Sequence, residues 1–205
     1  MVRIFILSLF LATCSLTGKS NDLDRLLEGN RRFMNGNLLH PNRTLERRKA
    51  TAYEQEPFAI IVSCSDSRVS PEVIFDEGIG DLFVVRLAGN VIDSAAKESI
   101  AYAVHYLHSS IILVLGHENC GAVNAVLQNQ DEDIPEIANL ISPSIKKVRL
   151  KNPKERLKAA IEANATAMRN KLIKDKNFKK NIAEDKLQIF SGYYHLKSGE
   201  VEILD

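Results

Sequence analysis

The chain has 205 residues, of which 45% are hydrophobic and 26% are charged, and its formal net charge at pH 7 is +1. That balance is typical of one globular domain with enough apolar content for a single core. A net charge so close to zero argues against a nucleic-acid-binding surface and against a strongly acidic partner, and therefore favours a small-molecule partner.

Residues 1–20 differ in kind from the rest. Arg3 precedes a nearly continuous apolar run at residues 4–12, which Thr-Cys-Ser follows. The run is shorter than the ~20 residues of a membrane-spanning helix, so it predicts a signal peptide or lipoprotein leader and an exported protein, periplasmic or lipid-anchored. The residues ending at Cys14 resemble a lipobox, and a lipid on Cys14 is the only membrane attachment expected. A cytoplasmic enzyme with an amino-terminal extension is the alternative.

Residues 21–205 are predicted to form one α/β domain. Apolar residues at helical spacing from Leu23 to Met34 predict an amino-terminal helical arm, and short apolar runs farther on predict strands between amphipathic helices. The expected strands are 58–63, 82–86, 111–115, 186–194 and 200–204. The expected helices include 93–108, 135–148 and 153–174, with shorter ones starting at 71 and 121.

This alternation indicates a central mixed, mostly parallel sheet of four to five strands flanked by helices. Within it, Gly116 is expected to let the backbone turn tightly before His117. The lysine-rich stretch at 171–180 is expected to be a solvated face.

Two polar motifs follow two of the predicted strands. Cys-Ser-Asp-Ser-Arg occupies residues 64–68 after the first strand, and His-Glu-Asn-Cys-Gly occupies residues 117–121 after the third. Ligands collect at the carboxyl ends of strands in parallel α/β sheets. The motifs therefore predict a shared site in which Cys64, His117 and Cys120 supply two thiolates and an imidazole.

That donor set favours zinc over magnesium or calcium, and the chain offers no fourth cysteine for an iron–sulfur cluster. Catalytic zinc sites keep three protein ligands and leave one position for water or substrate. Asp66 is the candidate fourth ligand, but Arg68 can hold the same carboxylate in a bidentate pair. Taken singly, a buried cysteine or an Asp-x-Arg pair has an ordinary structural interpretation; the metal site depends on their joint placement.

The two motifs together resemble those of the β-class carbonic anhydrases. Flanking segments extend the resemblance over most of the chain: Leu-Glu-Gly-Asn-Arg-Arg-Phe at 27–33, Val-Arg-Leu-Ala-Gly-Asn at 85–90, and the closing hairpin at 192–201. Leu87 departs from the asparagine expected after the strand's arginine. The absence of tryptophan favours the plant-like, open-site group, because the other group carries a tryptophan in an inhibitory bicarbonate site.

The resemblance implies a fold, a reaction and a zinc ion in each chain. Cys64, His117 and Cys120 would be permanent ligands of a zinc-bound hydroxide that attacks carbon dioxide reversibly to give bicarbonate and a proton. Asp66 would accept a hydrogen bond from the hydroxide while Arg68 anchors it, and in some members the aspartate swings onto zinc in an inactive form.

The resemblance also implies substrate contacts and an oligomer. Gln55 would hydrogen-bond substrate, Phe83 and Tyr102 would form an apolar wall, and the backbone N–H of Gly121 would bind a substrate oxygen. Phe83 and Tyr102 reach the site across a subunit interface in the family, which implies a homodimer or a dimer of dimers whose amino-terminal arm embraces the partner.

Two other functions remain open at this point. A related enzyme would hydrolyse carbonyl sulfide or carbon disulfide with the same zinc chemistry. A zinc-binding protein without hydration activity would have Asp66 permanently in the fourth position.

Overall fold

The computed structural model describes residues 20–204. The predicted leader lies outside the described residues apart from Ser20, and so does Cys14. In the part of the chain that is described, no helix combines the length and the apolar character needed to cross a membrane.

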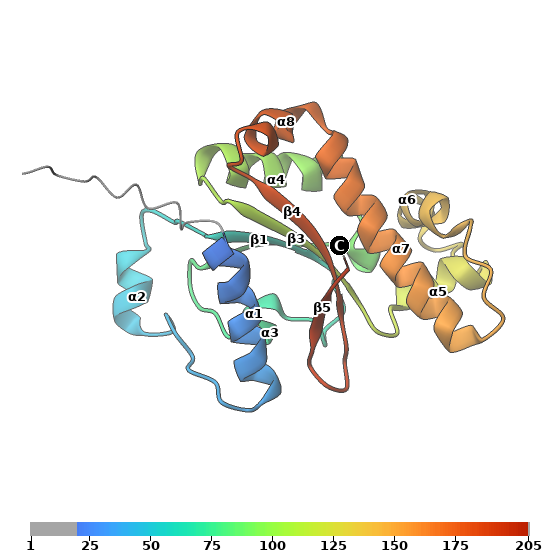
Figure 1. The fold of residues 1–205 in the computed structure, drawn as a ribbon, viewed down its shortest axis with the longest axis horizontal. Coiled ribbons are helices and arrows are strands. Elements are labelled where there is room, and N and C mark those ends of the chain that lie inside the picture. Colours follow the sequence, from blue (N-terminus) through green and yellow to red (C-terminus); the bar gives the residue numbers. More distant parts are fainter. Residues whose placement is uncertain (1–19, 205) are drawn as a thin grey trace, which may run out of the picture.

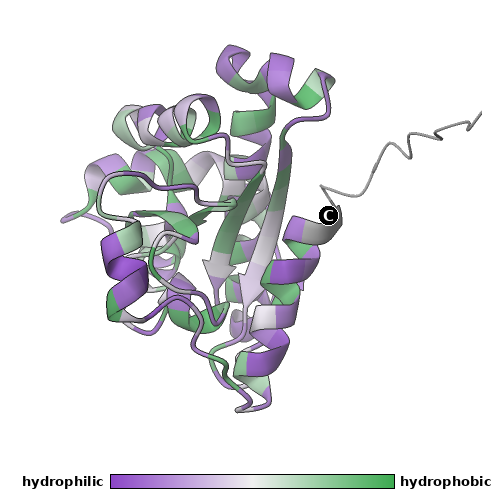
Figure 2. Ribbon diagram, turned by 90° about the vertical axis from the view of Figure 1, so that its left-hand side faces the viewer, coloured by the Kyte–Doolittle hydropathy of each residue, from purple (hydrophilic) through white to green (hydrophobic). Residues whose placement is uncertain are grey.

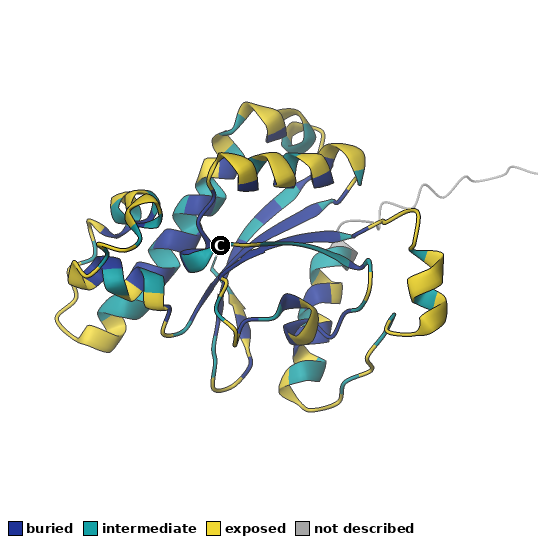
Figure 3. Cartoon of the chain, turned by 180° about the vertical axis from the view of Figure 1, so that it is seen from behind, coloured by how far each residue is buried: buried dark blue, intermediate teal, exposed yellow. Residues whose placement is uncertain are grey.

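Five strands form one mixed sheet in the order β2-β1-β3-β4-β5. The first four are mutually parallel and β5 runs antiparallel to β4, which confirms the predicted mixed, mostly parallel sheet. The strands are β1 Ala59–Ser63, β2 Leu82–Arg86, β3 Ile111–His117, β4 Gln188–Tyr194 and β5 Val201–Ile203. β1 and β3 are buried along their whole length (Figure 3), as expected for parallel strands that are covered on both faces.

Helices cover both faces of the sheet (Figure 1). Alternate residues of β1 face opposite sides: Ile60 and Val62 pack with α4, α7 and α8, whereas Ala59 and Ile61 pack with α1 and α3. The hydrophobic colouring in Figure 2 is concentrated in the middle of the sheet. The helices are α1 Ser20–Met34, α2 Leu45–Ala50, α3 Pro71–Ile74, α4 Ser94–Tyr106, α5 Gly121–Gln128, α6 Pro135–Ile145, α7 Pro153–Lys174 and α8 Lys176–Ala183, with a short 3₁₀ turn η1 at Ala88–Asn90.

The predicted amino-terminal helical arm is α1, and within one chain it packs on its own sheet. Leu26 is fully buried there. Asn30 donates to the carbonyl oxygens of Ile74 and Gly199 and accepts from the N–H of Val201. One buried amide thus links α1, α3 and β5.

Two local predictions are wrong. Gly116 lies inside β3 rather than at a turn, and a Cβ there would come within 2.8 Å of Ile161 on α7, so close helix–strand packing explains the glycine. The stretch at 171–180 is not one solvated face, because Asp175 ends α7 and caps α8, whose Phe178 is fully buried.

Candidate metal centre

The fold brings the three predicted ligands together at the carboxyl edge of the sheet. Cys64 follows β1, His117 is the last residue of β3, and Cys120 precedes α5. Because β1 and β3 are hydrogen-bonded neighbours with Ser63 opposite Leu115, their ends meet. The ligand atoms of these three residues all lie within 4.8 Å of one another, and all three residues are buried.

The histidine is oriented for a cation. Its Nδ1 lies 2.9 Å from the carbonyl oxygen of Glu118, an acceptor, so Nδ1 carries the proton. Its Nε2 is then an unprotonated acceptor, and it is buried without a hydrogen-bond partner among the described residues. A buried lone pair beside two thiols fits zinc, for which imidazole and thiolate are preferred ligands.

The protonation states of the two thiols depend on each other. The Cys120 thiol hydrogen-bonds Cys64 and lowers the pKa of Cys64, and backbone N–H groups, including that of Gly89 at 3.2 Å from Sγ, lower it further. The same bond and burial raise the pKa of Cys120. Two adjacent buried thiolates repel each other, so without a cation one thiol keeps its proton; a divalent metal would replace it.

Asp66 lies beside the ligand group and is held by Arg68. Nε and a terminal nitrogen of the guanidinium donate to the two carboxylate oxygens at 2.9 and 2.7 Å, and the Arg68 backbone N–H donates at 2.9 Å. These contacts hold the pKa of Asp66 well below its usual range. Asp66 Oδ2 is 3.9 Å from His117 Nε2. The carboxylate thus lies beside the predicted metal position while its hydrogen bonds go to Arg68. The role of Asp66 as a fourth metal ligand stays a prediction.

Arg86 shapes the site in a way that the two motifs did not indicate. Arg86 donates to the carbonyl oxygens of Cys64 and Asp66 at 2.9 and 2.7 Å, which fixes the loop between them. The pairing register of β1 and β2 could have revealed this role, since Arg86 ends β2 directly opposite Ser63. Leu87, the departure from the family pattern, has an extended backbone and donates its N–H to the carbonyl oxygen of Ser63, so the chain just after β2 stays bonded to the end of β1.

The four predicted substrate contacts do not lie together in one chain. Gly121 begins α5 next to Cys120, with open space where a Cβ would be. Gln55 and Tyr102 instead line a hollow of about 370 Å³ with Tyr53 and Tyr106.

That hollow lies at the amino edge of the sheet. Gln55 precedes β1, and Ser109, just before β3, donates to the carbonyl oxygen of Pro57. The five residues of β1 separate this edge from Cys64 by roughly 16 Å. Phe83 lies on β2, the outer strand, and is partly buried. In one chain Gln55 and Tyr102 therefore do not line the metal centre.

Comparison with known proteins settles the family. The family model described as "Carbonic anhydrase" matches residues 59–201, a stretch that contains all three ligand residues. The chain belongs to the β-class carbonic anhydrases. It is 40% identical over 187 residues to a carbonic anhydrase of Mycolicibacterium smegmatis, covering 87% of this chain and 89% of that protein. It is 48% identical over 126 residues to carbonic anhydrase 2 of Mycobacterium tuberculosis, covering 58% of this chain and 61% of that protein.

Solved structures support the same assignment. The β-carbonic anhydrase CafA of Aspergillus fumigatus superposes with a TM-score of 0.72 at 26% identity, covering 91% of this chain and 90% of that one. The predicted fold class and enzyme family are therefore confirmed.

Proposed function

We propose that this chain catalyses the reversible hydration of carbon dioxide to bicarbonate and a proton, with one zinc ion per chain held by Cys64, His117 and Cys120. The observation that carries the proposal is the buried group of three soft donors, including an unpartnered imidazole nitrogen, beside an aspartate fixed by an arginine. Two relatives at 40% and 48% identity that are named carbonic anhydrases support it.

Zinc in this position would supply the nucleophile, because it lowers the pKa of bound water from 15.7 to ~7 and so provides hydroxide at neutral pH. The protein orients that nucleophile through Asp66. An ionised carboxylate only accepts hydrogen bonds, and the lowered pKa of Asp66 keeps it ionised at neutral and mildly acid pH. By accepting a hydrogen bond from the attacking group, Asp66 would turn that group's lone pair toward carbon dioxide.

Gly121 would bind an oxygen of the substrate. Its N–H lies in the first turn of α5, where backbone N–H groups have no partner within the helix. The space beside its Cα is open, so a small molecule can approach. The positive end of the helix dipole also favours the negative charge that develops as bicarbonate forms.

The Asp66–Arg68 pair is the arrangement that the enzyme needs, because both carboxylate oxygens are bonded to Arg68. The zinc-binding protein without activity would instead need Asp66 bonded to the metal, and zinc-loaded protein distinguishes the two. No contact in the site specifically favours carbonyl sulfide or carbon disulfide as the substrate.

A second copy of the chain would complete the active site. Gln55 and Tyr102 are exposed and lie far from the metal centre of their own chain. We therefore propose a homodimer, alone or paired into a dimer of dimers, in which Gln55, Phe83 and Tyr102 of one chain face the metal of its partner.

Stopped-flow carbon dioxide hydration on zinc-loaded protein tests the proposed reaction. We expect rapid hydration that is abolished by a zinc chelator and restored by added zinc. Zinc-loaded protein that binds one ion per chain yet does not accelerate hydration at alkaline pH would contradict it.

We also propose that residues 1–20 direct export, with cleavage or lipidation at Cys14. The mass of the mature protein from cell fractions tests this: unprocessed full-length chain in the cytoplasm would contradict it.

A further inference from the structure

A fully buried asparagine on α7 is connected to the metal centre through one glycine. Asn164 is 0% exposed, and its Nδ2 donates to the carbonyl oxygen of Gly89 at 2.8 Å. The N–H of the same glycine donates to Cys64 Sγ at 3.2 Å. A single residue, Gly89, thus connects Asn164 to Cys64 Sγ. Asn164 is nevertheless 100 positions from Cys64 in the sequence and belongs to neither ligand motif.

The backbone at this glycine needs external support. Gly89 and Asn90 both have positive φ, 68° and 46°, inside the three-residue turn η1. Glycine takes a positive φ freely and asparagine takes one more readily than other side chains, so local sterics permit this turn but do not by themselves fix it. A Cβ on Gly89 would lie 2.8 Å from Cδ1 of Ile141, so the turn is also pressed against α6.

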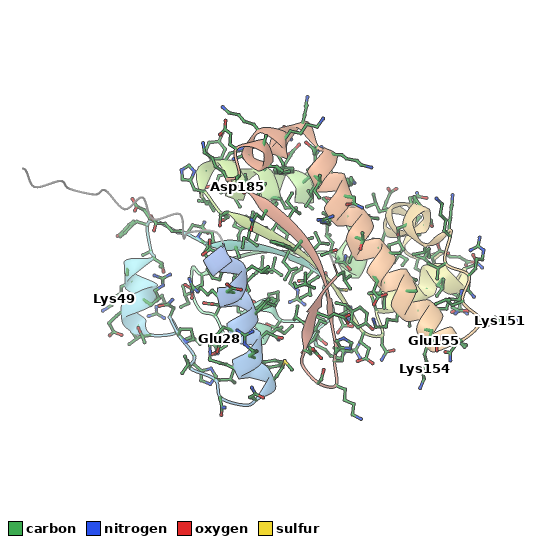
Figure 4. All side chains as sticks on the ribbon, viewed as in Figure 1. Glu28, Lys49, Lys151, Lys154, Glu155 and Asp185 are labelled. Carbon is green, nitrogen blue, oxygen red and sulfur yellow. The ribbon has the colours of Figure 1, made fainter. Side chains whose placement is uncertain are left out.

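Asn164 supplies that support. Within residues 20–204 it is the one side chain that donates a hydrogen bond to a carbonyl of the turn. A carbonyl can only accept, which requires Nδ2 to face Gly89 and turns Oδ1 toward the hydroxyl of Ser144 at 3.3 Å. The helix that carries it is firmly placed: Ala160 and Ile161 pack in the core around the ligands, while charged residues such as Lys154 and Glu155 point outward at its amino end (Figure 4).

We propose that Asn164 is a positioning residue for the metal thiolate: it holds Gly89 so that the Gly89 N–H stays directed at Cys64 Sγ. The proposal rests on the proposed zinc site. An N–H donor fixes the direction of the sulfur lone pairs and withdraws charge from the thiolate, and such outer contacts are part of what keeps a metal bound. Loss of the Asn164 amide would free the turn and leave Sγ less well oriented.

The test uses full-length, zinc-loaded protein and compares Asn164→Leu with Asn30→Leu. Both changes remove a buried amide that bonds backbone groups of other elements, but Asn30 lies on α1 and its amide hydrogen-bonds Ile74, Gly199 and Val201. We expect Asn164→Leu to release zinc to a chelator roughly tenfold faster, the lower end of the usual effect of an outer contact. We expect Asn30→Leu to release zinc at the wild-type rate, even if its thermal stability falls by as much as that of Asn164→Leu.

Cobalt-substituted protein gives a second measurement that does not depend on activity. The thiolate-to-cobalt charge-transfer band should shift in Asn164→Leu and stay unchanged in Asn30→Leu, because only the first alters the donor to Cys64. Asn164→Asp keeps the side-chain volume but places an oxygen against the Gly89 carbonyl, so it should shift the band in the same direction. It replaces Asn164→Leu in the test if the leucine variant does not fold.

The outcomes separate this inference from the proposed function. Wild-type protein that binds no zinc would overturn the metal site itself. Wild-type protein that binds zinc, with Asn164 variants that match it in release rate and cobalt spectrum, would overturn only the role of Asn164. Equal acceleration by Asn30→Leu would also overturn it, since the effect would then follow from general destabilisation.

Discussion

The carboxyl edge of the sheet carries a site that one chain forms alone, whereas the amino edge carries an open hollow. At the carboxyl edge one chain assembles three buried ligands, the Asp66–Arg68 pair and the Gly89 N–H without help from any other molecule. At the amino edge the hollow around Gln55 and Tyr102 is open, and Tyr53 beside it is 97% exposed.

That difference separates metal binding from substrate handling. Ligands must be within a few ångströms of one ion, so they come from strand ends that the backbone register fixes. An apolar wall for carbon dioxide needs only to be brought close to that ion, and a second copy can supply it. We therefore expect changes at the carboxyl edge to act on metal and chemistry within one chain, and changes at the amino edge to act on the partner's site.

The largest effect is expected from removing a ligand. Cys64→Ser or His117→Ala should abolish zinc binding and lower hydration at least about 1,000-fold, because the metal supplies several kcal/mol of transition-state stabilisation. Metal content by mass spectrometry and stopped-flow hydration would measure both. His105→Ala, an exposed histidine on α4 that stacks on Phe178, is the control and should keep zinc and activity. Full zinc content in His117→Ala would contradict the ligand assignment.

A smaller effect is expected from releasing Asp66. Arg68→Ala should keep zinc but lower hydration about 100-fold, the usual size of a positioned proton-transfer or hydrogen-bonding contribution. It should also raise the pKa of Asp66, because the Arg68 guanidinium is the main cause of its low value. An activity loss that starts at a higher pH than in the wild type would record that change.

Arg31→Ala is the matched control for Arg68→Ala. Arg31 forms an exposed pair with Glu28, its Nε 2.8 Å from Oε2, on the outer side of α1. Surface pairs of this kind contribute little, so hydration should be unchanged. Equal losses in both variants would show that the effect of Arg68 does not arise at the site.

The sequence predicted the carboxyl edge well because its information is local. Each ligand follows an apolar run that ends at a defined residue, and strand ends that pair in parallel meet by necessity. Arg86 and Asn164 were not identified, since their roles depend on strand register and helix packing rather than on spacing. The error at Gly116 has the same origin: the need for glycine comes from Ile161, 45 positions away on another element.

Mixing chains tests whether the amino edge acts in the partner. Cys64→Ser alone lacks metal, and Gln55→Ala alone lacks the expected substrate contact. In a heterodimer of the two, one site would combine the intact metal ligands of one chain with the intact Gln55 of the other. Random pairing in a two-fold dimer should then restore about one quarter of wild-type activity in the mixture, and the isolated mixed dimer, with one of its two sites intact, should have about one half. Co-expressed, separately tagged chains purified over two affinity steps would isolate the mixed dimer, and a mixed dimer as inactive as its parents would show that Gln55 does not act across the interface.

The smallest effect on catalysis is expected from changing a buried carboxylate that lies just after α3 and is bonded to the last turn of α1. Asp76 is 0% exposed; it accepts from Arg32 Nε at 2.7 Å and from the backbone N–H groups of Leu39 and His40 at 2.9 and 3.0 Å. Burial alone would raise its pKa, but these donors outweigh burial and the pKa of Asp76 is lowered. Asp76→Asn should cost about 3 kcal/mol of unfolding free energy, because it leaves the Arg32 charge unpaired.

The pH dependence of that cost tests its origin. The Asp76 carboxylate stabilises the fold above its unfolded-state pKa of about 3.9, and the stabilisation is lost as pH falls through the lower folded-state pKa. The difference in unfolding free energy between wild type and Asp76→Asn, measured by urea unfolding, should therefore have its full value at pH 7 and decrease below about pH 4. Comparison at equal chain concentration removes the contribution of assembly. Zinc content and the hydration rate at pH 7 should match the wild type, since this carboxylate secures the segment after α1. Within residues 20–204 it has no hydrogen bond or ion pair to a residue of the metal centre. Loss of zinc in Asp76→Asn would show that the metal centre depends on this segment.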